Sequence, residues 1–232
     1  PGLNTWRIPN EDSQDLELDD LSLFETNRYP GRDRIDDGVR VAYGIENALY
    51  GNRGGKAEAF IGQSWRIFGE ENVLQNSGIR NNLSDIVGRV RIAPADYLNL
   101  TYRFRVDAKS ISFRRQEVAA SAGIPALRVN VAYIDLSDRI GNSEFANRRQ
   151  VRFGVSSQFT PRWSAFGAAV FDLVSSRPQP QALSVAVRYQ NECCTATLTY
   201  ERRVDLLSDT KASNRFLISI IFKYLGEVRH GI

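Results

Sequence analysis

The amino-acid sequence predicts an all-β fold, the C-terminal portion of an antiparallel transmembrane outer-membrane β-barrel. The first observation is alternation: in LNLTYRFRV, residues 98–106, every second side chain is apolar and the others are polar. This is the period of a strand whose two faces meet different surroundings. The second observation is that short and long connections alternate along the chain, as they do in outer-membrane barrels. The third is that no apolar run approaches the roughly 18 residues of a membrane helix.

About eleven strands are expected, each close to the 9–11 residues that cross a bilayer when tilted. They are placed at 39–49, 56–67, 84–93, 97–107, 111–121, 126–136, 149–159, 162–173, 182–192, 193–203 and 214–224. The fifth is the weakest because Arg114 and Arg115 break its alternation, which predicts a bulge or a position at the rim. An odd number of strands does not close a bacterial single-chain barrel. Since the chain also lacks methionine, we expect it to be the later part of a longer protein.

The connections divide the chain into three regions. Residues 1–38 are predicted to form an acidic loop that is extracellular or folded into the lumen, 39–224 the barrel strands, and 225–232 a periplasmic tail. The acidic carboxylates lack the spacing of a calcium loop. Long polar connections are expected outside the cell at 68–83, 137–148, 174–181 and 204–213. Tight turns are expected on the periplasmic side at 51–55, 160–162 and 193–194.

Two sets of side chains fit the faces of such a barrel. Aromatic residues near strand ends match an interface belt, although ordinary core packing in a soluble β-protein would also explain them: Tyr97, Trp163, Phe171, Tyr189, Tyr200 and Tyr224. The polar face carries lumen-facing candidates: Arg89, Arg91, Arg103, Arg105, Arg152 and Arg188. These arginines either make a wide interior polar and form ion pairs with a plug, or hold the phosphates of a passing glycolipid.

Catalysis and cofactor binding find no support in the sequence. His230 is the only histidine and lies in the tail, where a flexible terminal residue is expected. No P-loop, metal-ligand spacing or cysteine–histidine couple occurs, so we predict no enzyme activity, no metal site and no cofactor. The chain is basic, with a net charge of +3. Because its arginines are dispersed rather than clustered, no nucleic-acid partner is expected.

Several stretches resemble one known family. They are NEDS, DDLSLF and NRYPGRDRIDDGVRVAYG near the start, then GQSWR, then YQNECCTATLTYERR, and FKYLGE close to the end. In this order they are similar to the C-terminal half of the LPS-assembly protein family LptD, also called OstA. The resemblance implies an outer-membrane translocon component that inserts lipopolysaccharide into the outer leaflet. It also implies an LptE-like lipoprotein plug and a periplasmic LPS-transport bridge as partners.

The resemblance assigns a role to the only two cysteines, Cys193 and Cys194. In the family, an adjacent pair near the end of the barrel forms disulfides to an N-terminal periplasmic domain. Adjacent residues are poorly placed to bond to each other, and disulfides persist in the periplasm. The chain contains no partner cysteine, so two free thiols remain the alternative.

The resemblance also makes the seam beside the last predicted strand a lateral gate for lipopolysaccharide. The gate candidates are Phe216, Ile218, Ile220 and Phe222 on one face and Ile221 on the other. The alternative interpretation is that the apolar inner face of this strand packs against a plug in the lumen. Two other functions stay open, namely a porin-like diffusion channel and a soluble β-sandwich or lipocalin-like binder.

Overall fold

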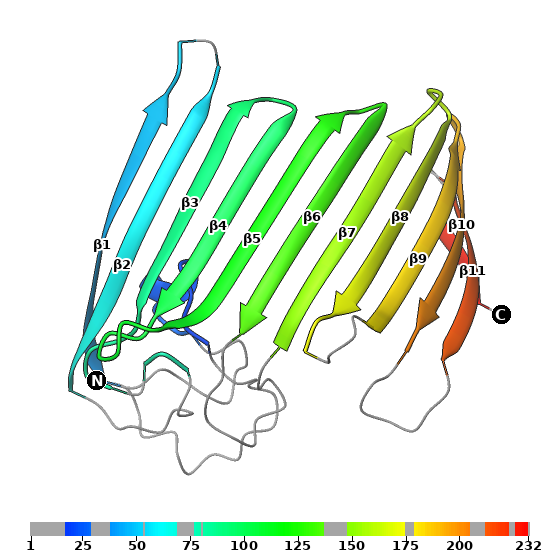
Figure 1. The fold of residues 1–232 in the computed structure, drawn as a ribbon. Helices are drawn as coiled ribbons and strands as arrows, with labels where there is room; N and C mark the ends of the chain where they lie inside the picture. Colours follow the sequence, from blue (N-terminus) through cyan, green and yellow to red (C-terminus); the bar gives the residue numbers. More distant parts are fainter. Residues whose placement is uncertain are drawn as a thin grey trace. The chain divides into compact units, whose positions relative to one another are not determined.

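The computed structural model describes residues 17–28, 38–52, 54–68, 77–79, 81–136, 148–174, 179–204, 212–222 and 226–231. These residues form one short 3-10 helix, η2 (Ser22–Phe24), and a sheet of twelve strands in the order of the sequence (Figure 1). The strands are β1 (Val39–Tyr50), β2 (Lys56–Phe68), β3 (Ile86–Ala95), β4 (Leu98–Val106), β5 (Phe113–Ile124), β6 (Leu127–Leu136), β7 (Arg148–Gln158), β8 (Trp163–Asp172), β9 (Gln179–Gln190), β10 (Cys194–Arg203), β11 (Ser213–Phe222) and β12 (Gly226–Gly231). No helix of the described residues is long and apolar enough to cross a membrane.

All eleven strands expected from the alternation are present, with ends shifted by a few residues. The sheet has a twelfth strand in addition to these. Residues 226–231, which lie in the segment expected as a periplasmic tail, pair antiparallel with β11. A six-residue segment with mixed side chains carries little periodic signal, whereas an open edge of backbone donors and acceptors supplies a partner for it.

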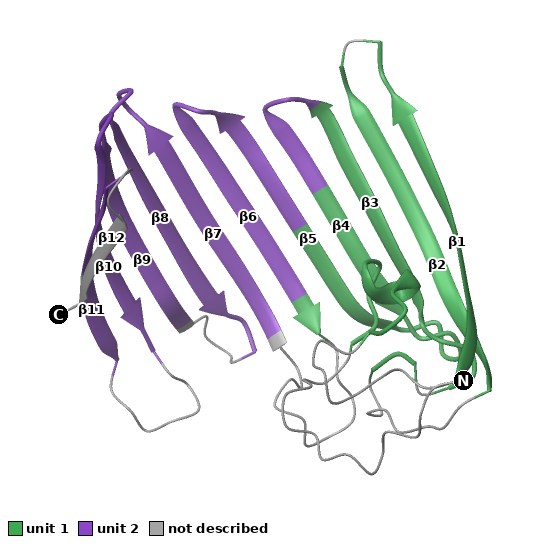
Figure 2. Ribbon diagram, turned by 180° about the vertical axis from the view of Figure 1, so that it is seen from behind, with its two compact units in different colours: residues 1–94, 101–118, 135–147 green, residues 95–100, 119–134, 148–232 purple. Residues whose placement is uncertain are grey.

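The chain divides into two compact units (Figure 2). Unit 1 comprises 1–94, 101–118 and 135–147, and unit 2 comprises 95–100, 119–134 and 148–232. Unit 1 contains the antiparallel pairs β1–β2 and β2–β3. Unit 2 contains the continuous run from β7 to β12, in which each strand pairs antiparallel with the next.

The sheet of unit 1 has two chemically different faces. On β1, Val41, Tyr43 and Ile45 are exposed, Ile45 by 71%, and they alternate with Arg40 and Glu46 on the opposite face. We call the first the outer face and the second the inner face. Large apolar side chains that stay exposed on a sheet indicate a surface that meets another apolar phase.

The run β7–β12 of unit 2 shows the same alternation. The register places Arg188, Thr197 and Ser219 in one row across β9, β10 and β11. The neighbouring row holds Val187, Leu198 and Ile218, whose side chains are exposed. We call the first side of unit 2 its polar face and the second its apolar face.

One tight turn depends on a glycine. Gly123 has a φ of 121° in β5, just before the turn at Pro125 and Ala126, and a Cβ there would lie 2.1 Å from the Leu127 carbonyl oxygen. Only glycine adopts this conformation at no steric cost. The AGIP motif therefore sets where β5 ends and β6 begins.

Candidate functional site on the inner face

Residues Glu17–Phe24, which we call the inner segment, lie on the inner face of unit 1. Leu18 and Leu23 are fully buried and form an apolar cluster with Val87 of β3 and Ile79. Gly62 of β2 makes room for this packing, because a Cβ there would lie 2.5 Å from Leu23 Cδ2. The segment is thus held by the hydrophobic effect where the sheet offers a small residue and an apolar floor.

The inner segment is shaped by its own side chains. The Asp19 carboxylate accepts hydrogen bonds from the backbone N–H groups of Leu21 (3.0 Å) and Ser22 (2.7 Å). The Ser22 hydroxyl in turn accepts one from the Asp19 N–H at 3.1 Å. Aspartate and serine commonly cap a helical turn in this way. The turn leaves the next carboxylate, that of Asp20, on the sheet side of the segment.

Asp20 binds two arginines of the sheet. Its side chain is only 2% exposed, and its oxygens lie 2.8 Å from Arg89 Nη1 on β3 and 3.4 Å from Arg103 Nε on β4. Glu46 of β1 lies 3.3 Å from the other terminal nitrogen of Arg89. A carboxylate this buried requires compensating charge, which the two guanidinium groups supply.

A second ion-paired group surrounds Arg105 of β4, whose residue is 5% exposed. It lies 3.0 Å from Glu17 and 3.5 Å from Asp85, and it donates to the backbone carbonyls of Leu18 and Ser77. Arg115 of β5 also binds Glu17, at 2.7 Å. Burial raises the pKa of Asp85, and the nearby Arg105 opposes that rise.

The six predicted lumen-facing arginines therefore separate into groups. Arg89, Arg103 and Arg105 bind the inner segment, whereas Arg91 lies 3.4 Å from Glu58 of β2. In unit 2, Arg188 lies over the Phe166 ring, 5.0 Å from its centre, and Arg152 is exposed on β7. Ion pairing with a folded-in segment is thus observed for three of them, and phosphate binding by any of the six stays a prediction.

Sequence reasoning did not single out Glu17, Asp20 and Arg115. A signal for the first two was present, because ELDDLSLF combines carboxylates with leucines in a segment long enough to cover one row of arginines. Arg115 was noted only as a break in the alternation. The rim position expected there is borne out by Arg114, whose guanidinium lies 2.7 Å from Asp107 in the β4–β5 connection.

The two cysteines lie at the start of β10. Both are free thiols, with Cys193 exposed and Cys194 half-buried. The turn that contains Cys193 is closed by a 2.9 Å hydrogen bond from the Asn191 N–H to the Cys194 carbonyl. An exposed thiol in a tight turn is accessible to a cysteine of another domain. The disulfide to an upstream cysteine stays a prediction.

The gate candidates occupy both faces of β11. Phe216, Ile218, Ile220 and Phe222 are exposed on its apolar face. Ile221 belongs to the polar row and is 39% exposed. β12 pairs with β11, so β11 is not the last strand of this chain. No cluster of three or more histidine, cysteine, aspartate or glutamate side chains suited to a metal ion occurs in the described part of the chain.

Comparison with known proteins shows the family to which this chain is related. The family model described as LptD, LPS transport system D, matches residues 4–163. This chain belongs to the LptD family. The LPS-assembly protein LptD of Xylella fastidiosa (strain 9a5c) is 24% identical over 95% of the chain, and that of Aeromonas salmonicida (strain A449) is 25% identical over the same share. The LptD of Salmonella typhimurium is 26% identical over 85% of the chain.

The LptD match shows the fold class of this chain and its cellular location. Together with the antiparallel sheet, it makes the chain part of an outer-membrane β-barrel in the cell outer membrane of a Gram-negative bacterium. The chain spans 29% of the length of the Xylella relative and 28% of the Aeromonas relative. Among solved structures, a triple mutant of the Rhodopseudomonas blastica porin aligns over 83% of both chains, with 9% identity and a TM-score of 0.46.

Proposed function

We propose that this chain is the C-terminal barrel portion of a translocon that inserts lipopolysaccharide into the outer leaflet of the outer membrane. The LptD family match over residues 4–163 carries the proposal. The structure agrees with it in two respects: one sheet face is apolar and exposed, and the other holds a charged, ion-paired segment. A wall of this kind separates lipid from a polar passage.

The transport role is tested on the full-length protein in its own outer membrane. Depletion should stop newly made lipopolysaccharide from reaching the cell surface, measured as pulse-labelled lipopolysaccharide accessible to an outside probe. Re-expression of the wild-type protein should restore it, and depletion of an unrelated outer-membrane barrel is the control. Normal delivery after depletion, together with ion conductance of the purified protein, would instead favour a porin-like channel.

Lipopolysaccharide leaves, in this proposal, through a lateral gate beside β11. The polar row of β11 contains Leu217 and Ile221 as well as Ser219, and such apolar side chains suit acyl chains that move along the inside of the barrel. The apolar face, with Phe216, Ile218, Ile220 and Phe222, faces the membrane. The backbone of β12 pairs with the other edge of β11. The seam therefore either opens between β11 and β12, in which case β12 moves away, or it lies at the far edge of β12.

The two faces of β11 offer a matched test of the gate. Ile221 and Ile220 are adjacent, similarly exposed (39% and 37%) and on opposite faces. A photoreactive residue at Ile221 should capture lipopolysaccharide during active transport, and capture should fall when the supply is blocked. The same residue at Ile220 should capture membrane lipid regardless of transport. Capture of a lipoprotein alone at Ile221, whatever the transport state, would mean that this face contacts a plug.

The proposal includes three further elements of the assembly. An LptE-like lipoprotein plugs the lumen and contacts exposed polar residues such as Arg152. A periplasmic LPS-transport bridge delivers the substrate to the upstream domain. Cys193 and Cys194 bond to cysteines of that domain and fix it beneath the barrel.

A further inference from the structure

One charged residue of β9, β10 and β11 lies on the opposite face from the others. The strand register places four charged side chains of these described strands on the polar face: Arg188, Glu201, Arg203 and Arg215. There Glu201 lies 3.1 Å from Arg215 and 3.9 Å from Arg203. Arg202 instead belongs to the apolar face, in one row with Leu183 of β9 and Asn214 of β11.

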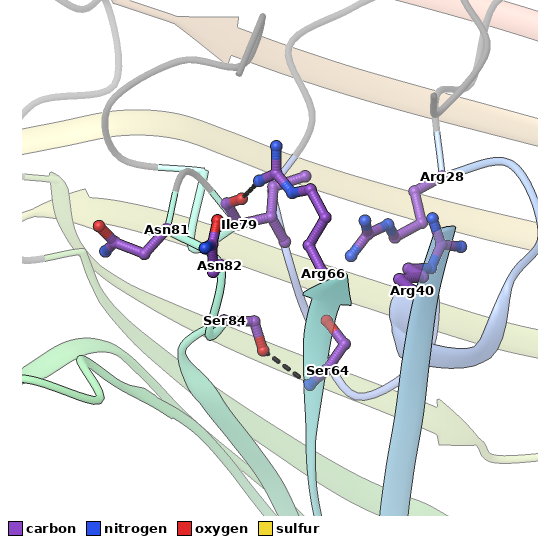
Figure 3. Close-up of a pocket in the computed structure, with 8 residues that line it drawn as sticks. All are labelled: Arg28, Arg40, Ser64, Arg66, Ile79, Asn81, Asn82 and Ser84. Carbon is purple, nitrogen blue, oxygen red and sulfur yellow. Dashed lines mark hydrogen bonds between the residues drawn. The ribbon is translucent and has the colours of Figure 1, made fainter. Parts of the chain in front are cut away.

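Arginines on the inner face of unit 1 have contacts within the fold, as those on the polar face of unit 2 do. Arg40 and Arg66 are cross-strand partners, and Arg66 donates to the backbone carbonyl of Ile79 (Figure 3). Arg202 is exposed, and within the described residues it forms no ion pair. A lone cation among apolar side chains therefore requires an explanation in terms of what meets this face.

The position of Arg202 along β10 gives that explanation. It is the last residue of β10 on the apolar face, just before the connection at 204–213 that is expected outside the cell. One row closer to the middle of the strand, the rings of Tyr200 and Phe216 lie 5.0 Å apart. Aromatic belts mark the boundary between acyl chains and headgroups, and arginine on a lipid face is tolerated near that boundary. Arg202 is thus placed at the level of lipid headgroups.

The neighbours of Arg202 select the chemistry of the headgroup. The Tyr200 hydroxyl donates to the Asn214 side-chain oxygen at 3.1 Å, which leaves the carboxamide nitrogen of Asn214 as a donor. Asn214 lies directly opposite Arg202, so their Cβ atoms are about 5 Å apart. Both side chains thus offer donors to one anionic acceptor. Guanidinium forks match the oxygens of phosphate.

A similar pair in unit 1 shows what is particular to this one. On the outer face of that unit, the Tyr43 hydroxyl donates to the side-chain oxygen of its cross-strand partner Gln63 at 2.8 Å. The carboxamide nitrogen of Gln63 then donates to the Ser84 carbonyl at 2.9 Å. Its donor is used inside the protein, whereas that of Asn214 has no such partner among the described residues and lies beside a guanidinium.

We propose that Arg202 and Asn214, next to the Tyr200–Phe216 pair, bind the phosphate of a phosphorylated membrane lipid on the outside of the barrel wall. The occupant is a lipid, because exposed Leu183 and Phe216 beside the two donors suit its acyl chains. Its leaflet is the outer one if 204–213 lies outside the cell. The site requires only that the apolar face of unit 2 meets a membrane, and it does not depend on the transport role.

The test uses the full-length protein in vesicles of phosphatidylcholine that contain lipid A with its phosphates or, at equal mole fraction, the same lipid without them. A photoreactive residue at Leu183, the register neighbour of Arg202, captures lipid locally. The phosphorylated lipid should be captured roughly fivefold more, the effect of one arginine close to an anionic surface. High ionic strength should reduce this preference, because salt screens exposed charges.

Two substitutions test the two donors. Arg202→Gln should remove the preference for the phosphorylated lipid. Asn214→Asp should weaken it, because the carboxylate still accepts from the Tyr200 hydroxyl but replaces a donor by a negative charge. Heat-modifiable migration on gels confirms that each variant is folded.

The chain offers a matched control for charge and another for depth. Arg203→Gln makes the same charge change one residue away on the polar face, and it should keep the preference. A photoreactive residue at Val187, on the apolar face closer to the middle of β9, should capture both lipids equally. Because both leaflets of the vesicle contain the lipid, the result does not depend on which end of β10 lies outside the cell.

Two results would overturn the site. One is equal capture of both lipids at Leu183 in the wild type, and the other is the same loss of preference in Arg202→Gln and Arg203→Gln. If either is found while depletion still blocks lipopolysaccharide delivery, the transport role stands without this site.

Discussion

Asp20 shows what a single residue contributes to this barrel wall. A buried carboxylate is costly to desolvate, and here the cost is offset by Arg89 and Arg103 rather than by water. Removing one partner of such a group leaves like charges facing each other, which destabilises more than the intact pair stabilises. The same residue therefore decides whether the inner segment rests on the sheet or is repelled from it.

Asp20→Asn should loosen the inner segment. We expect a loss of about 1–3 kcal/mol, below the value for a fully buried pair because the Arg103 side chain is 34% exposed. The readouts are the thermal midpoint and protease cleavage within 17–28 of the full-length protein. Asp96→Asn, at an exposed turn, should change neither. Additive effects of Asp20→Asn and Arg89→Gln in a double-mutant cycle would show that the pair is not coupled.

Asp107 gives the connection between β4 and β5 a pH dependence. The backbone N–H of Ser110 (2.8 Å), the Arg114 guanidinium (2.7 Å) and the N–H of Lys109 (2.9 Å) hold the pKa of Asp107 well below its usual range. Because the folded pKa is lower than the unfolded value of about 4, this stabilisation is complete above about pH 4 and is lost as the pH falls further.

The consequence is measurable as hydrogen exchange in residues 107–112. In the wild type, protection of the Lys109 and Ser110 amides should fall as the pH drops below about 4, after correction for intrinsic exchange. In Asp107→Asn this protection should be weaker at neutral pH and should vary little over the same range. An unchanged pH profile in Asp107→Asn would mean that another group controls the turn.

At the scale of one strand, alternation decides which surface a substitution meets. Val185 and Ser184 are adjacent in the middle of β9 and have neighbours on both sides. Val185 is exposed on the apolar face, between Gly167 and Tyr200. Ser184 belongs to the polar row and lies opposite Glu201 of β10.

Arginine at these two positions should have different effects. Val185→Arg should cost about 2–4 kcal/mol of folding stability in lipid, the range for arginine on a lipid face near the midplane. Ser184→Arg should be tolerated, because the new charge lies opposite Glu201 and in a polar interior. Urea titration of folding into lipid vesicles measures both. Equal destabilisation would show that the two faces of unit 2 are assigned the wrong way round.

At the level of the whole molecule, the lengths of the connections predict on which side of the membrane each of them lies. If successive strands alternate in direction throughout, we expect the connections 51–55, 125–126 and 191–193 on one side of the membrane and 107–112 on the other. Outer-membrane barrels place short turns in the periplasm and longer loops outside. The connections expected outside the cell at 137–148 and 204–213 lie largely outside the described residues.

Topology is tested with a short epitope inserted at one position at a time. A tag after Ser110 should be detected by antibody on intact cells. A tag between Pro125 and Ala126 should be detected only after the outer membrane is permeabilised. The reverse pattern would invert the barrel, and it would also place Cys193 and Cys194 outside the cell.

We expect the two cysteines to connect this chain to the rest of the full-length protein. Cys193 and Cys194 should each bond to a different upstream cysteine, because neighbours at a turn are poorly placed to bond to each other. Non-reducing gels of Cys193→Ser, Cys194→Ser and the double variant should show two partial losses and one complete loss of the cross-linked form. A disulfide between Cys193 and Cys194 in the mature protein would contradict this.

The strands could be predicted from the sequence, because alternation with a period of two is a local property that the segments carry, with one break in the fifth at Arg114 and Arg115. The sequence also determined which residues of each strand share a face, and the break in the pattern at Arg114 and Arg115 predicted a bulge or a rim position there. These features need only the geometry of an extended backbone. The LptD resemblance rested on motifs that are likewise visible in the linear chain.

The contacts of the polar faces could be read only from the folded protein. Asp20 meets Arg89 across 69 positions of sequence and Arg105 meets Glu17 across 88, and no periodicity encodes such pairings. The opposition of Arg40 and Arg66 depends on the register of β1 against β2, which a one-residue slip would abolish. The pairing of β12 with β11 likewise arises from an open sheet edge, because backbone donors and acceptors there bind a strand whatever its side-chain pattern.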